Sequence, residues 1–169
     1  ALAGSESFKW GAITGVIVGG ATKAVALYHN TSNIPSYKQS EKTVSSRTKG
    51  GREQVSYLDG VEVPTNTPGS TRPDIVVNNP DGTVRAIEVK NYDLSNPDFR
   101  KKLANNYATQ YISRLKNLPA GSTQEIVLDV RGRNLSYKDI KETRNEIEKA
   151  LKNVLGPKYK KPKIKVMRY

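Results

Sequence analysis

Residues 72–90 read RPDIVVNNPDGTVRAIEVK, and this stretch decides the fold. The runs over 74–78 and 84–90 are rich in β-branched residues, which favour strands. Between them, Asn, Pro, Asp and Gly are typical turn formers. We therefore predict a β-hairpin whose two strands are joined by a loop over 79–83.

The length of this loop fixes which residues face each other across the hairpin. With a loop over 79–83, Asn78 faces Val84 and Asp74 faces Glu88. Side chains alternate between faces, so Lys90 shares a face with Glu88. Carboxylates that face each other directly repel, but together they can hold one hard divalent cation. The alternate apolar residues are expected in the core: Ile75, Val77, Ile87 and Val89.

The remainder of the chain predicts helices that alternate with strands. Apolar residues recur at helical spacing along 96–118, with the stripe Phe99, Leu103, Tyr107, Tyr111, Leu115 and Leu118. Ser136 and Asp139 have the spacing of a capping box at the start of another helix. The other predicted elements are a helix over 50–58 and strands over 124–131 and 163–168. The fold class is mixed α/β (α+β), with a single mixed sheet flanked by helices.

Composition restricts both the partner and the chemistry. The 28 Lys and Arg outnumber the 16 Asp and Glu, and the resulting net charge of +12 favours a polyanionic partner, either nucleic acid or a membrane surface. The chain has no cysteine and one histidine, His29, which excludes thiolate sites and mechanisms that need two histidines. Hydrolytic chemistry would therefore depend on carboxylates, lysine and a bound metal.

The chain divides by composition into three parts. Residues 1–28 are a Gly-rich lead-in, 29–49 a polar linker that runs into a helix, and 50–169 the main domain. In the lead-in, Gly11, Gly15 and Gly19 recur at every fourth position, a spacing that permits close helix packing. The apolar run is shorter than the about 20 residues of a membrane-spanning helix. We expect no stable membrane anchor. Transient membrane contact of residues 11–27 and a simple linker role stay open.

Pro73, Asp74, Glu88 and Lys90, with 13 residues between the two acids, resemble the motif of PD-(D/E)XK nucleases. The resemblance covers about residues 50–131. It implies a restriction-endonuclease-like core and metal-dependent cleavage of phosphodiester bonds. Asp74 and Glu88 would bind the metal, with Mg²⁺ preferred and Mn²⁺ or Zn²⁺ as alternatives. Lys90 would orient the attacking water and offset charge in the transition state.

Six further residues are assigned to the site on looser grounds. The family pattern carries an acidic residue on the helix before the hairpin, and Glu53 is the candidate for it. The pattern also carries polar residues on the helix after the hairpin. Here Gln110 and Arg114 lie within the apolar stripe of that helix. Polar groups in a buried stripe need partners, such as the two carboxylates or a substrate phosphate. Nucleic-acid contacts are assigned to Arg72, Arg114, Arg131 and Arg133.

The lead-in suggests where such a nuclease would work. Residues 7–15 resemble the region that precedes the C-terminal toxin domains of contact-dependent growth inhibition and related polymorphic toxin systems. This implies a secreted or cell-surface-delivered toxin that acts in the cytoplasm of the target cell and is neutralised by an acidic immunity protein. The substrate, DNA or tRNA, stays open. So do a repair or restriction endonuclease and a non-catalytic nucleic-acid-binding module.

A lysine-rich segment ends the sequence and has two interpretations. Residues 158–165 read KYKKPKIK, and the final strand is expected at an edge of the sheet. Lysines on an edge strand prevent pairing with other chains. They also suit contact with a phosphate backbone.

Overall fold

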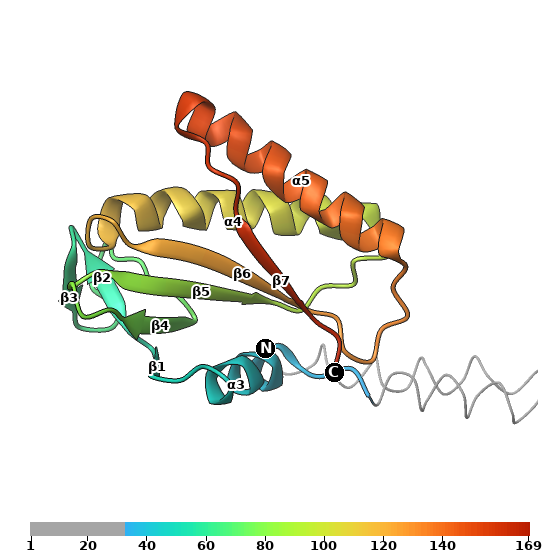
Figure 1. The fold of residues 1–169 in the computed structure, drawn as a ribbon, viewed down its shortest axis with the longest axis horizontal. Coiled ribbons are helices and arrows are strands. Elements are labelled where there is room, and N and C mark those ends of the chain that lie inside the picture. The colour runs from blue at the N-terminus through green and yellow to red at the C-terminus, as the bar shows by residue number, and fades with distance from the viewer. Residues whose placement is uncertain (1–32) are drawn as a thin grey trace, which may run out of the picture. The chain divides into compact units, whose positions relative to one another are not determined.

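The computed structural model describes residues 33–169, of which 35–169 form one compact unit (Figure 1). Three features of the sequence analysis lie outside the described residues: the predicted lead-in over 1–28, the membrane contact over 11–27 and His29. None of the helices within 33–169 is both long and apolar enough to cross a membrane.

A five-stranded mixed sheet forms the centre of the unit and confirms the predicted fold class. Its order is β1-β4-β5-β6-β7, with antiparallel pairing from β1 to β5 and parallel pairing from β5 to β7. The strands are β1 (Gly51–Glu53), β4 (Ile75–Asn78), β5 (Val84–Lys90), β6 (Thr123–Asp129) and β7 (Lys163–Met167). A separate two-stranded sheet pairs β2 (Ser56–Leu58) with β3 (Val61–Val63).

The β4–β5 hairpin has the predicted register. Asn78 pairs with Val84, and Ile75 pairs with Ile87. The turn is stabilised by the Asp81 carboxylate, which accepts hydrogen bonds from the backbone N–H and the hydroxyl of Thr83. Local turn chemistry thus sets the register that positions the site.

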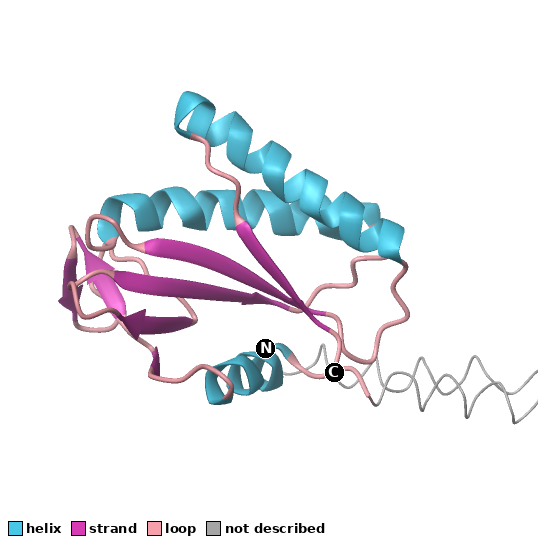
Figure 2. Cartoon of the chain, in the orientation of Figure 1, coloured by secondary structure: helices cyan, strands magenta, loops and turns pink. Residues whose placement is uncertain are grey.

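Within residues 33–169, three α-helices cover the sheet, two on one face and one on the other (Figures 1 and 2). α4 (Pro97–Asn117) and α5 (Tyr137–Leu155) share a face, and α3 (Tyr37–Ser46) lies on the opposite one. A short 3-10 helix, η1 (Gly156–Lys158), follows α5. The predicted capping box of Ser136 with Asp139 is present at the start of α5.

The main core lies between the sheet and the pair α4 and α5. From the predicted stripe, Leu103 and Tyr107 are fully buried, whereas Phe99 and Leu115 are 42% and 55% exposed. The stripe is therefore narrower than predicted, because α5 covers only part of α4. Buried residues from the helices and β6 complete this cluster, among them Ile126, Leu128, Ile140, Ile147 and Leu151.

The predicted helix over 50–58 is wrong, since this segment forms β1 and β2. Gly50 and Gln54 have positive φ angles of 72° and 61°, which a right-handed helix does not accommodate. The true helix lies earlier, at α3, inside the range interpreted as a linker that runs into a helix. Val44 of α3 packs against Ile75 and Ile87. The compact unit that contains α3 spans Pro35–Tyr169.

Candidate active site

Asp74 and Glu88 meet at the end of the β4–β5 hairpin. Asp74 directly precedes β4, and its Oδ2 accepts a hydrogen bond of 2.7 Å from the backbone N–H of Val89. This bond anchors the carboxyl of Asp74 to β5, one residue beyond Glu88. The predicted juxtaposition of the two acids thus follows from the ladder and from one side-chain contact.

Glu88 is a buried carboxylate held between two cations. Its side chain is 3% exposed; Oε1 lies 2.5 Å from Nζ of Lys90, and Oε2 accepts a hydrogen bond from Nη2 of Arg114 on α4. Burial alone would raise the pKa of Glu88, but the positive charges of Arg114 and Lys90 outweigh burial and hold this pKa below its ordinary value. Glu88 is therefore ionised in the folded protein at neutral pH.

Asp74 has the opposite electrostatic environment. Burial and the negative charge of Glu88 raise the pKa of Asp74 to about 7, although the N–H of Val89 favours the ionised form. Glu41 adds further repulsion. Two carboxyls whose environments push their pKa values apart are a common feature of acid–base and metal sites.

Glu41, on α3, is an acidic residue near the site that the sequence interpretation missed. Burial raises the pKa of Glu41, and the negative charges of Glu88 and Glu53 raise it further. A sequence signal was available: Ser36 and Gln39 have the spacing of a capping box, and the structure has that box at the start of α3. It would have predicted a helix carrying Glu41 ahead of the hairpin.

Glu53 does not lie on a helix, which corrects the reason for choosing it. It ends β1, pairs with Ile75 in the ladder and has an exposed side chain. Of the two acids, Glu41 is the one carried by a helix before the hairpin. We call Asp74, Glu88 and the neighbouring Glu41 the acidic cluster, and Glu53 lies at its margin.

Of the two α4 residues assigned to the site, Arg114 contacts it from the other layer, whereas Gln110 has no hydrogen bond or ion pair to Asp74, Glu88 or Lys90. Arg114 is 1% exposed and pairs with Glu88. Its Nε and Nη1, together with Oε1 of Gln110 and the hydroxyl of Tyr107, are buried and lack hydrogen-bond partners among the described residues. Such a group of buried polar atoms is suited to water or to a polar ligand.

The other arginines assigned to nucleic acid have different surroundings. Arg72 is exposed two residues before Asp74, and its positive charge reaches Glu41. Arg131 instead forms an ion pair of 2.7 Å with buried Asp129. Arg133 donates to the side-chain oxygen of Asn91. Arg131 and Arg133 thus have internal partners, while Arg72 is open to solvent.

The donor atoms at this site suit a hard divalent cation. Within residues 33–169, no group of three or more acidic, His or Cys side chains comes close enough together to hold a metal ion. Asp74 and Glu88 nevertheless both offer carboxylate oxygens, each with two lone pairs, and a bound cation would offset the burial and the repulsion from Glu88 that raise the pKa of Asp74. The two carboxylates therefore fit the divalent cation that the sequence resemblance implies.

Comparison with protein-family models, with curated proteins and with solved structures found no match to this chain.

Replacing Arg114 by Met should destabilise the protein by about 3–5 kcal/mol, because Glu88 then keeps a buried charge with one cation fewer. Urea unfolding at pH 8 measures this loss. The loss should shrink at pH 4, where Glu88 of the variant can be protonated. Lys116→Met, two residues further along α4 and exposed, is the matched control and should cost little. Equal losses in the two variants would contradict the ion pair.

The pKa of Asp74 predicts a pH dependence of stability in metal-free protein. A carboxyl whose pKa is raised to about 7 in the folded protein makes its full contribution to stability at pH values below its pKa in the unfolded chain. This contribution is lost as the pH rises through about 7. In EDTA, the wild-type unfolding temperature should therefore fall more between pH 5 and pH 8 than that of Asp74→Asn. Glu146→Gln, on α5, should keep the wild-type dependence. Identical curves for wild type and Asp74→Asn would refute the assignment.

Proposed function

We propose that the protein is a metal-dependent nuclease that hydrolyses phosphodiester bonds. The observation that carries the proposal is the juxtaposition of Asp74 with Glu88 across one hairpin, with the ammonium of Lys90 at 2.5 Å from Glu88. Two acids placed together at a buried position destabilise a sheet, so the stability of the fold does not explain why they are there. A cation-binding hydrolytic site accounts for all three residues.

Each residue has a distinct part in this mechanism. Asp74 and Glu88 bind the divalent cation, which when bound polarises the scissile phosphate. Arg114 keeps Glu88 ionised and fixed in direction, so it is a positioning residue. Lys90 orients the attacking water and offsets the negative charge that develops on the phosphate oxygens.

Charge supports nucleic acid as the substrate. The net charge of +12 favours a polyanion, and Arg72 is exposed beside the site. DNA and tRNA both fit this argument. The toxin role belongs to the same proposal and is supported by the sequence resemblance of residues 7–15, together with an acidic immunity protein whose charge would complement this chain.

Cleavage assays on plasmid DNA and on bulk tRNA, with Mg²⁺ and with EDTA, test the proposal. Asp74→Asn, Glu88→Gln and Lys90→Met should each lower the cleavage rate by about a hundredfold or more, because each removes a metal ligand or a charge that stabilises the transition state. Asp98→Asn is the matched control, since it changes an exposed acid in the first turn of α4. It should retain cleavage.

Calorimetric titration with Mg²⁺ separates the roles of these residues. Asp74→Asn should weaken metal binding, whereas Lys90→Met should leave it largely intact, because an ammonium does not ligate a cation. Circular dichroism checks that each variant is folded. Full activity in folded Asp74→Asn or Glu88→Gln protein would sink the nuclease assignment.

A further inference from the structure

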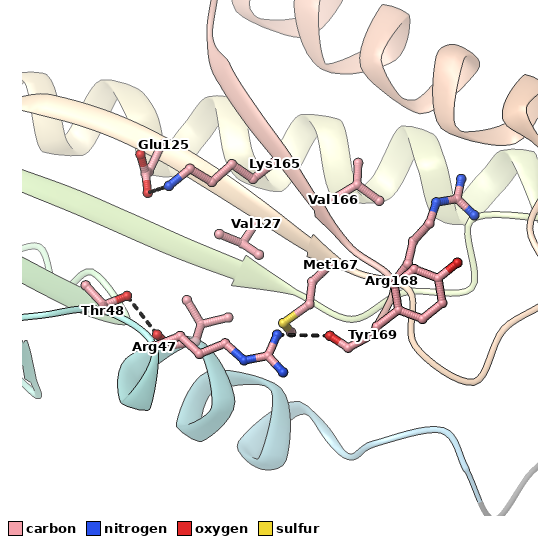
Figure 3. Close-up of a pocket in the computed structure, with 10 residues that line it drawn as sticks. Arg47, Thr48, Glu125, Val127, Lys165, Val166, Met167, Arg168 and Tyr169 are labelled. Atoms are coloured by element: carbon pink, nitrogen blue, oxygen red, sulfur yellow. Dashed lines mark hydrogen bonds and ion pairs between the residues drawn. The ribbon is translucent and has the colours of Figure 1, made fainter.

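A groove lies on the α3 side of the sheet, away from the acidic cluster (Figure 3). Its volume is about 370 Å³, and it runs between the C-terminal end of α3 and the strands β6 and β7. The lining residues include Val44, Arg47, Glu125, Val127, Lys165 and Met167. Because α3 has 10 residues, it covers only part of this face and leaves the groove open beside it.

The groove combines an apolar floor with a cationic rim. Val44 and Val127 belong to one buried cluster, against which Met167 packs. Arg47 and Lys165 line opposite sides of the groove: the guanidinium of Arg47 donates a hydrogen bond to the backbone oxygen of Tyr169, and the ammonium of Lys165 is directed at Glu125 (Figure 3). An occupant with an apolar face and an anionic group would match both parts.

A buried acid beside the groove holds Lys165, one of the two rim cations, in place. Glu125 is 2% exposed, and its carboxylate lies 3.1 Å from Arg85, 3.2 Å from Lys163 and 3.0 Å from Lys165. Burial would raise the pKa of Glu125, but hydrogen bonds from Lys165 and Lys163 lower it below its ordinary value. Three cations around one ionised acid leave an excess of two positive charges, to which Arg47 adds a third.

Fixed cations above an apolar floor are suited to a nucleotide. Long lysine side chains lose conformational entropy when they bind a phosphate, and the carboxylate of Glu125 has already restricted theirs. The floor can receive a base or sugar. The volume is also of the size that accommodates small ligands.

We propose that this groove binds a nucleotide of the substrate strand, with Arg47 and Lys165 on its phosphate and the apolar floor against its base or sugar. The inference rests on the proposed nuclease function and extends it to the path of the substrate. Arg47 caps the C-terminal end of α3, the helix that also carries Glu41 six residues earlier.

Binding of a short fluorescein-labelled oligothymidine and its RNA counterpart, measured by anisotropy in EDTA, tests the groove without cleavage. The double variant Arg47→Gln/Lys165→Gln should raise the Kd about tenfold and reduce the slope of log K against log salt by about 0.7, since a single strand contributes about 0.7 per phosphate contact and the two cations share one phosphate. The control is Lys101→Gln/Lys102→Gln, which removes the same charge from the exposed face of α4. It should change neither quantity appreciably.

Equal effects of the two double variants on the Kd and on the salt slope would overturn the proposal that the groove binds a nucleotide. They would show only general charge attraction between the protein and the oligonucleotide. If the first double variant does not fold, the single variant Arg47→Gln replaces it, because Glu125 then keeps Arg85, Lys163 and Lys165 as partners. A wild-type Kd and salt slope in that variant would overturn the inference. The nuclease assignment fails by a different result, namely full cleavage by Asp74→Asn, so the two failures are distinguishable.

Discussion

A buried charge at the centre of the sheet constrains much of this structure. Glu88 lies on β5, the middle strand, and its two oxygens contact Lys90 and Arg114. An ionised carboxylate in this position would be costly without both cations, so strand and helix are held in one arrangement. The same pairing fixes the α4 layer over the hairpin and directs Lys90 toward the acids. The pKa of Asp74 rises instead, because burial and the negative charge of Glu88 outweigh the hydrogen bond from Val89.

The hairpin and its two acids could be predicted because their determinants are local. Turn residues at 79–83 set the register, and strand periodicity then places Asp74 near Glu88. The helix at α5 was equally accessible, since Ser136 and Asp139 cap it within one turn. In both cases a few neighbouring residues contain the whole signal. The contact of Arg114 with a carboxylate could also be predicted from the sequence, because a charged residue within an apolar stripe needs a partner.

The misplaced features depend on contacts between distant parts of the chain. Residues 50–58 have an apolar pattern compatible with a helix, but β1 is stabilised by pairing with β4, some 22 residues later. Glu41 is brought to the site by the packing of Val44 against the sheet, which periodicity within α3 does not reveal. Arg131 was expected at a phosphate, and its ion pair with Asp129 depends on the burial of that strand end. The groove beside β7 likewise depends on how little of the sheet α3 covers.

The central claim is that Asp74 and Glu88 jointly hold one divalent cation. Anomalous diffraction from crystals of the protein grown with Mn²⁺ tests this claim most directly. The account predicts one anomalous peak within about 2.5 Å of a carboxylate oxygen of each residue, a usual distance for oxygen ligands of hard cations. Its loss in crystals of Asp74→Asn should follow. The account would be contradicted if anomalous peaks occurred only at other places on the protein and no metal were bound at Asp74 and Glu88.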